Sequence, residues 1–390
     1  RIYFNIKGEK MKKIGIITFH NSYNCGSMLE SYAMQKSIEK YCSDNVEIID
    51  FSNEVQKNLY KIFFKNNSLK NILKNILLLP NHRKLKMNNM KYEEFRDKNF
   101  RLSKNKFNNM NELNDKDYSC IVSGSDQIWN VTIPDADDAY FLPWVNSAKK
   151  VAYAPSFGSK NILKYAKDPE KYKKYLMNYD YLSIRERNGQ KWIKDMINKE
   201  VPVLIDPTLI LTAPCYDEIL ANDINEKEKY IFFYCPSFNQ DICKYVKKIS
   251  KKYNLKVITW SCKSYSTRMI KRFGFELAKY ENPSSYLYYI KNAELVLTTS
   301  FHGTIFSTIY NKKFFTIKNG DMYGDDDRVI TLLLQLKMLD RLIAYDFDNT
   351  FNYLKEVDYS EYNNQIKELQ MEAIKYLMES VGGRRNESNK

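Results

Sequence analysis

Short apolar runs and stretches with helical spacing alternate along most of this chain. The runs are rich in β-branched residues and are typical of buried strands, whereas the amphipathic stretches are typical of helices. In the first half, the predicted strands are 14–18, 46–50, 119–123, 151–154 and 181–184, and the predicted helices are 27–41, 169–178 and 186–197. In the second half, the predicted strands are 230–234, 256–260, 294–299 and 314–317, and the predicted helices are 238–253, 283–292, 302–310 and 361–380. This alternation predicts parallel sheets joined by right-handed crossovers.

The two strand–helix series predict two domains, because 390 residues exceed what one hydrophobic core usually fills. We therefore expect an α/β protein with two Rossmann-like domains facing a cleft. The expected boundaries are 11–215 for the N-terminal domain and 225–345 for the C-terminal domain, followed by C-terminal helices at 350–381. Residues 1–10 are expected to be an extension without a role in the fold, and the polar residues 382–390 a disordered tail.

A lysine-rich stretch at 56–110 is expected to form a helical insert in the N-terminal domain. Within it, residues 69–79 are amphipathic, with Ile72, Leu73 and Ile76 on one side. Such a helix is compatible with contact at a membrane surface. The favoured interpretation is that it covers the first sheet or lines the cleft, because surface helices of globular proteins share this pattern.

Charge and cysteine usage narrow the function classes. The net charge of +14 is spread along the chain without a compact basic stripe or a nucleic-acid-binding signature, so a nucleic-acid partner is not expected. A diffuse positive field suits phosphorylated or membrane-linked substrates instead. The seven cysteines form no C-x-x-C pair, which argues against a disulfide framework and a zinc site. We expect a cytoplasmic protein, with peripheral contact at the inner face of the membrane as an option.

The junction after the predicted strand 294–299 is the most informative part of the sequence. The apolar run stops at Ser300, and a helix with Phe301, His302 and Gly303 in its first turn follows. The side chain of His302 is thereby placed at the carboxyl end of a sheet and beside a helix N-terminus. Open α/β sheets bind their ligands at such ends, and free backbone N–H groups favour anions. A lone histidine is more often structural, so the position alone does not decide its role.

Three other loops follow predicted strands. The loop at 20–27 places Asn24 and Gly26 before the first helix, as a ligand loop or only as a capped turn. The loop at 123–130 is rich in hydrogen-bonding side chains that suit sugar hydroxyls, with Trp129 as a stacking face; the alternative is a tight turn with a core tryptophan. The strand at 181–184 ends at Arg185, which either recognises a carboxylate or phosphate or forms a surface pair with Glu186.

The order of these motifs is more specific than any one of them. Asn-Cys-Gly-Ser at 24–27, the segments 123–130, 153–158, 183–186 and 206–208, and Ser-Phe-His-Gly-Thr at 300–304 occur in sequence. Over residues 11–345 this series resembles the bacterial polysaccharide pyruvyl transferase family. The resemblance implies an arrangement like that of type B glycosyltransferases. It also implies transfer of pyruvate from phosphoenolpyruvate to a sugar of a cell-surface polysaccharide, forming a ketal.

The resemblance also implies roles for individual residues. His302 matches the family's active-site histidine, and Arg185 an arginine that binds phosphoenolpyruvate. Ser300 stands where better-known members carry an arginine, so we expect Arg187, Arg268 or Arg328 to supply the missing charge. The donor site would then comprise Arg185 of the N-terminal domain together with Ser300, Gly303, Thr304 and Arg328 of the C-terminal domain. The C-terminal domain would be the donor side. The acceptor site of the N-terminal domain would comprise Asn24, Gly26, Ser125, Asp126, Gln127 and Trp129.

In the implied reaction, His302 acts as general acid–base, since imidazoles titrate near neutral pH. No metal and no cofactor are expected, with phosphoenolpyruvate as co-substrate and a glycan or lipid-linked saccharide as acceptor. The first alternative is a nucleotide-sugar-dependent glycosyltransferase of the same two-domain type, in which Arg185 and His302 contact a diphosphate. The second alternative is a non-catalytic glycan-binding relative. The acceptor sugar and the oligomeric state are not determined by the sequence.

Overall fold

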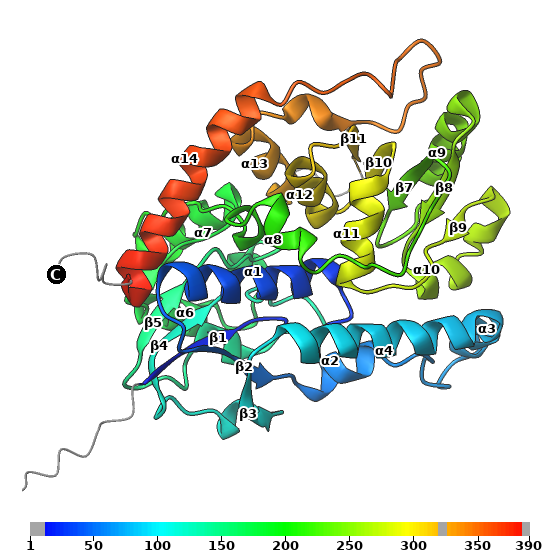
Figure 1. Cartoon of the computed structure of the whole chain (residues 1–390). Helices are drawn as coiled ribbons and strands as arrows, with labels where there is room; N and C mark the ends of the chain where they lie inside the picture. The colour runs from blue at the N-terminus through cyan, green and yellow to red at the C-terminus, as the bar shows by residue number, and fades with distance from the viewer. Residues whose placement is uncertain (1–11, 319–325, 384–390) are drawn as a thin grey trace, which may run out of the picture.

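The chain folds around two six-stranded parallel sheets, one in each half. We analysed a computed structural model, which describes residues 12–318 and 326–383. The expected extension at 1–10 and all but the first two residues of the expected tail at 382–390 lie outside the described residues. Figure 1 shows the two halves stacked, with helix α14 running back along one side to the N-terminal half. The predicted α/β class is confirmed.

The N-terminal sheet has the strand order β3-β2-β1-β4-β5-β6. Its strands are β1 Lys13–Ile17, β2 Val46–Phe51, β3 Leu102–Phe107, β4 Tyr118–Ser123, β5 Lys149–Ala152 and β6 Tyr181–Leu182. Its helices are α1 Cys25–Tyr41, α2 Glu54–Leu59, α3 Leu69–Leu78, α4 His82–Asn99, α5 Ile162–Tyr165, α6 Pro169–Met177, α7 Arg187–Ile197 and α8 Ala213–Asp217. The short helical turns are η1 Leu79–Asn81, η2 Met110–Glu112, η3 Asp138–Phe141 and η4 Pro207–Leu209.

The C-terminal sheet repeats this plan, with the order β12-β11-β10-β7-β8-β9. Its strands are β7 Tyr230–Tyr234, β8 Lys256–Thr259, β9 Glu276–Leu277, β10 Leu295–Thr298, β11 Phe314–Ile317 and β12 Leu342–Ile343. The helices are α9 Gln240–Tyr253, α10 Cys262–Thr267, α11 Pro283–Asn292, α12 Phe301–Ile309, α13 Arg328–Gln335 and α14 Ser360–Leu377, with turns η5 Ile270–Phe273, η6 Leu339–Arg341 and η7 Met378–Gly382. Counted from its own first strand, each sheet has the order 3-2-1-4-5-6 of a doubly wound dinucleotide-type fold.

An apolar contact joins the two halves. Met28 and Leu29 of α1 belong to the same buried cluster as Tyr216 and Phe306, whose rings lie 5.0 Å apart. Helix α14 adds a second connection, because the hydroxyl of Tyr376 donates to the backbone oxygen of Ala152 at 2.9 Å. The loops at the carboxyl ends of both sheets are thereby held facing each other.

The structure corrects two element predictions. The stretch 56–110 is not entirely helical, because Leu102–Phe107 forms the edge strand β3. Helix α4 packs against the core through Tyr92 and Phe95, but α3 covers neither the sheet nor the cleft. Residues 350–359 contain no helix, since α14 begins at Ser360.

Throughout 12–318 and 326–383, every helix is too short or too polar to span a bilayer.

Candidate active site

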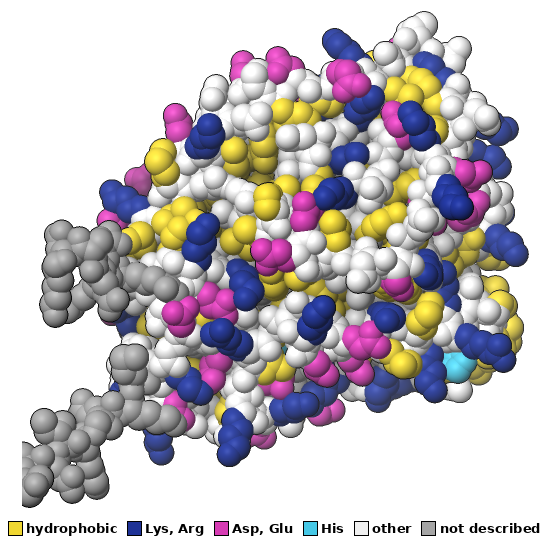
Figure 2. Space-filling view, viewed as in Figure 1, with side chains coloured by type: hydrophobic (Ala, Val, Ile, Leu, Met, Phe, Trp, Pro, Cys, Tyr) yellow, Lys and Arg dark blue, Asp and Glu magenta, His cyan; other side chains and the backbone are white. Residues whose placement is uncertain are grey.

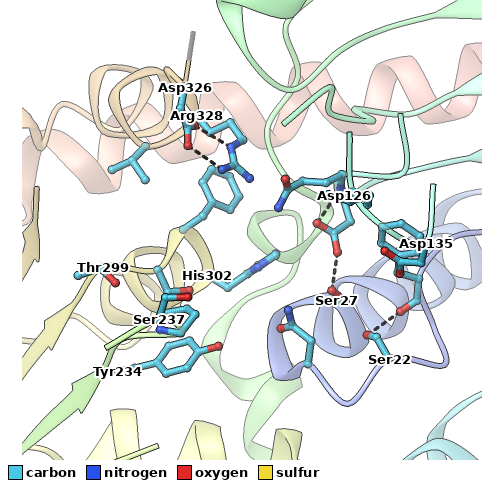
Figure 3. A pocket seen from close by; sticks show the side chains of 18 of the residues that line it. Ser22, Ser27, Asp126, Asp135, Tyr234, Ser237, Thr299, His302, Asp326 and Arg328 are labelled. Atoms are coloured by element: carbon cyan, nitrogen blue, oxygen red, sulfur yellow. Dashed lines mark hydrogen bonds and ion pairs between the residues drawn. The ribbon is translucent and has the colours of Figure 1, made fainter. Parts of the chain in front are cut away.

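A cavity of about 490 Å³ lies where the carboxyl ends of the two sheets face each other. Most of its wall is built by the segments that follow β1, β4, β7 and β10, and Tyr60 and the start of α13 complete it. These strands lie at the centre of their sheets, where the direction of chain progression reverses and where doubly wound folds bind ligands. Figure 3 shows side chains from both halves pointing into this space. The cavity is therefore the candidate active site.

His302 reaches the cavity from the first turn of α12. Ser300 caps this helix, its hydroxyl accepting from the backbone N–H of Gly303 at 3.3 Å. The His302 side chain is 10% exposed, and its Nε2 lies 3.5 Å from Oδ2 of Asp206 and 4.0 Å from Oε2 of Glu30. The ring rests against Gly26 of α1, where a Cβ atom would lie only 2.2 Å from Nδ1. An imidazole from the C-terminal half is thus seated on the N-terminal half.

Arg185 meets His302 at a shared carboxylate. Its Nη1 donates to Oδ2 of Asp206 at 2.7 Å, the same oxygen that faces the imidazole. Arg185 is buried, and its guanidinium lies 4.4 Å from the ring centroid of Phe301. It is not a surface pair with Glu186, nor is it part of the cavity wall. The guanidinium and the imidazole therefore meet across the domain junction, but through Asp206.

The buried carboxyl groups around this junction differ in their charge states. Burial disfavours ionisation of Asp206, but His302, the Arg185 guanidinium and the Thr208 hydroxyl outweigh it and hold the pKa of Asp206 well below its usual range. Burial, with the charges of Asp126 and Asp206, raises the pKa of Glu30 well above its usual range. Asp206 is therefore the ionised partner of the histidine, and Glu30 is a neutral acid beside it.

Six of the residues expected from the sequence line the cavity: Asn24, Asp126, Gln127, Ser300, His302 and Arg328. Asp126 has a left-handed φ of 67° and accepts from the hydroxyl of Ser27 and the backbone N–H of Gln127. Arg328 donates two hydrogen bonds of 2.8 Å to Asp326, and Figure 3 shows this pair side by side, across the cavity from Asp126 and Ser27. The wall thus offers hydroxyl, amide and carboxylate groups on one side and a paired arginine on the other.

Comparison with known proteins places the chain in a family. The family model for polysaccharide pyruvyl transferase matches residues 24–321. The chain belongs to the polysaccharide pyruvyl transferase family. It is therefore a transferase, and the family implies a pyruvate donor and a glycan acceptor. No curated protein sequence gave a match.

Solved structures support the fold. The chain is similar to a UDP-N-acetylglucosamine 2-epimerase, with a TM-score of 0.51 and 10% identity, covering 98% of this chain and 99% of the other. The Neisseria meningitidis UDP-GlcNAc 2-epimerase has a TM-score of 0.45 and 9% identity, covering 95% and 100%. For the Escherichia coli heptosyltransferase WaaC these values are 0.39 and 9%, covering 91% and 99%. At such low identity the first of these similarities supports the two-domain fold alone.

Several expected ligand contacts are structural in this transferase. Trp129 is fully buried and donates to the backbone oxygen of Tyr140 at 3.1 Å, so it is a core tryptophan and not a stacking face. Ser125 is also buried and donates to the backbone oxygen of Ala154. Gly26 contacts His302 and does not line the cavity. These three lie behind the cavity wall and not at its surface.

The residues expected to bind the donor need similar corrections. Gly303 permits the close approach of α12 to β10, since a Cβ atom there would lie 2.3 Å from Oγ1 of Thr298. The buried Thr304 hydroxyl donates to the backbone oxygen of Ser300 and contacts the Thr316 hydroxyl. Arg187 and Arg268 are exposed and do not line the cavity, so Arg328 alone of the three candidate replacements for the missing arginine faces it.

Asp206 and Glu30 were not among the residues expected in the site. Asp206 belongs to the Asp-Pro-Thr motif, in which its other oxygen accepts from the backbone N–H and hydroxyl of Thr208. That motif was a usable signal for Asp206. Glu30 lies inside α1, and neither of its carboxyl oxygens has a hydrogen-bond partner among the described residues. The sequence feature that could have identified Glu30 is a glutamate in a helix whose other positions are mostly small or apolar.

Glu30, Asp206 and His302 bring potential metal-ligand atoms within 4.8 Å of one another. The Asp206 oxygen that faces Glu30 and His302 also accepts a hydrogen bond from Arg185. The positive charge of this nearby guanidinium repels a cation. The donor set therefore suits proton sharing better than metal binding.

A second cavity of about 300 Å³ adjoins the first, and Asn24, Tyr60 and Tyr234 line both. Its further wall is aromatic and amide-rich, with Tyr23, Asn88, Tyr92 and Trp260. Burial raises the pKa of its Glu281 to about 7. The two cavities therefore share part of their walls at the domain junction.

Proposed function

We propose that this transferase moves the pyruvyl group of phosphoenolpyruvate onto two hydroxyls of one sugar, forming a ketal and releasing phosphate. The observation that carries the proposal is the placement of His302 at the cavity wall with its Nε2 turned to the ionised Asp206. An aspartate in this position orients an imidazole and balances the charge that the ring acquires. A general acid beside an anion site is what protonation of an enol phosphate needs.

The reaction proceeds in three steps. His302 first turns its Nε2, which is buried beside Asp206 in this structure, into the cavity. This atom gives its proton to the methylene carbon of the donor, and the adjacent carbon becomes oxocarbenium-like. One sugar hydroxyl forms a C–O bond to that carbon and returns its proton to the histidine. The second hydroxyl then displaces phosphate, which leaves with the C–O bond electrons and the second hydroxyl proton. Atoms and charge balance without an oxidant or a reductant.

The donor anion lies at the N-terminus of α12. Backbone N–H groups in the first turn of a helix attract phosphate and carboxylate, and His302 stands in that turn. Arg328 adds a cationic side chain within the cavity. Arg185 acts as a positioning residue, because it holds Asp206 against the imidazole and lies behind Phe301. The N-terminus and Arg328 together replace the arginine absent at position 300.

The acceptor lies on the opposite wall. Asn24, Asp126 and Gln127 offer both donors and acceptors for sugar hydroxyls. The adjoining cavity, with the partly exposed Tyr23 and Tyr60, accommodates the neighbouring sugars, since aromatic faces suit the C–H surfaces of saccharides. The acceptor is accordingly a saccharide longer than one residue.

The test uses purified protein with phosphoenolpyruvate and saccharide acceptors, measuring phosphate release and the mass of the product. We expect His302→Ala to lose about 10²–10⁴-fold in kcat, the contribution typical of a general acid. His82→Ala is the matched control, because His82 lines neither cavity and should leave the rate unchanged. Retention of more than about a tenth of the rate by His302→Ala contradicts the assigned role. Nucleotide release from nucleotide sugars would indicate a glycosyltransferase, and saturable glycan binding without turnover a binding protein.

A further inference from the structure

Helix α3 turns its apolar face outward. The side chains of Leu69, Leu73 and Ile76 are 80%, 62% and 54% exposed, and Ile72 and Leu77 are exposed as well. These positions follow the i, i+3, i+4, i+7 spacing that normally faces a core. Helix α3 therefore exposes the apolar face that amphipathic helices of globular proteins normally bury.

This orientation is built into the segment. Asn75 Oδ1 accepts from the backbone N–H of Phe64 at 2.9 Å, and its Nδ2 donates to the Phe64 oxygen at 3.0 Å. The Lys74 ammonium lies 4.8 Å from the Phe64 ring centroid. At the end of the helix, Leu78 is fully buried against Leu85 and Cys262. The polar side of α3 is thus bonded to the protein, which leaves the leucine face without a partner.

The surroundings of this face are uniformly basic. No aspartate or glutamate occurs between Glu54 and Glu93. The same stretch contains Lys57, Lys61, Lys65, Lys70, Lys74, Arg83, Lys84, Lys86 and Lys91. Figure 2 shows hydrophobic and basic side chains together at the lower right, where α3 and the start of α4 lie in Figure 1.

We propose that α3 docks this protein onto an anionic lipid bilayer, with Leu69, Leu73 and Ile76 inserted between headgroups. A short helix with an apolar face and flanking lysines lies in the plane of a membrane interface, and its lysines are attracted to anionic lipids. The charge argues against a second copy of the chain as the occupant, because pairing α3 with itself would bring lysines against lysines. The ten residues of α3 dock at the surface and do not span it.

Helix α3 packs beside residues that line the second cavity. Ile62 and Leu85 line that cavity, and they belong to the same apolar cluster as Leu78 at the end of α3. A saccharide carried on a membrane lipid would reach the second cavity from this side. The docking proposal does not depend on the reaction, because it concerns the lipid surface alone.

The experiment is co-sedimentation of the purified protein with phosphatidylcholine vesicles, with and without phosphatidylglycerol. We expect the protein to bind only the anionic vesicles, and binding to weaken as salt is raised. Leu69→Ser/Leu73→Ser/Ile76→Ser should reduce the binding constant more than about tenfold, since three apolar side chains no longer leave water. Lys65→Gln/Lys70→Gln should reduce it about fivefold per lysine at low salt.

The matched controls carry substitutions of the same kind, apolar to serine and lysine to glutamine, on other elements. Met177→Ser/Met371→Ser removes two methionines that are each 64% exposed, on α6 and α14, and Lys164→Gln/Lys367→Gln removes two exposed lysines. Both controls should bind within about twofold of the unchanged protein. The unfolding midpoint of each variant verifies that it folds. Equal binding by the α3 triple variant, or no binding by the unchanged protein, overturns the proposal. A dimer that the triple variant converts to monomer overturns it as well.

Discussion

Replacing Gly26 by alanine tests the seating of the His302 ring directly. Gly26 lies in the first turn of α1, directly against the His302 ring. A Cβ atom at Gly26 would lie 2.2 Å from Nδ1, 2.6 Å from Cγ and 3.0 Å from Cβ of His302. Real side chains do not approach this closely, so the ring must rotate or α1 must move. Either response separates the imidazole from Asp206.

The magnitude follows from two opposing contributions. Inserting a methyl group into a packed site costs about 1–3 kcal/mol. Alanine in place of glycine within a helix recovers up to about 1 kcal/mol. We therefore expect Gly26→Ala to lower the free energy of unfolding by about 1 kcal/mol. The effect on kcat/KM should be larger, about 10²-fold, because a displacement of about 1 Å at a catalytic group has that consequence.

A double-mutant cycle separates this clash from a general effect on α1. Gly26→Ala, His302→Ala and the double variant are compared by urea unfolding and by phosphate release. Without the imidazole the new methyl group has space, so Gly26→Ala should be neutral or slightly stabilising in the His302→Ala background. We expect a coupling energy of about 1–3 kcal/mol between the two sites. Additive losses in stability would refute the contact.

Three further predictions concern the buried carboxyl groups. Asp206→Ala should lower the free energy of unfolding by about 3–5 kcal/mol, because it leaves the Arg185 charge buried without its nearest partner, and Asp206→Asn should lower it less; urea unfolding measures both. Burial raises the pKa of Glu186 to about 7, so the folded state binds the proton more tightly than the unfolded chain, and stability falls as pH rises from about 4.5 to 7. Glu186→Gln should make the free energy of unfolding less dependent on pH, by up to about 3 kcal/mol between pH 4.5 and 8, as measured by urea unfolding at several pH values. An unchanged pH dependence contradicts the assignment. Glu30→Gln should leave kcat within about threefold at pH 7, because glutamine replaces a carboxyl group that burial keeps neutral, whereas a large loss would indicate an ionised Glu30.

The strands of the fold were largely predictable because most are short apolar runs. The strand β3 was missed because its sequence Leu-Ser-Lys-Asn-Lys-Phe is polar and lies at a sheet edge, with only Ser103 buried. The strands β9 and β12 have two residues each, too few to show a pattern. The orientation of α3 was not predictable, since an amphipathic pattern defines two faces but not which of them finds a partner.

The site was predictable where it depends on strand ends. The loops after β1, β4 and β10 supplied Asn24, Asp126 and His302, because the carboxyl ends of parallel strands share one edge. Asp206 and Glu30 come from a loop before η4 and from the interior of a helix, and their meeting with His302 depends on how the two halves dock. The same docking makes Gly26 a contact for His302 and places Arg185 behind Phe301.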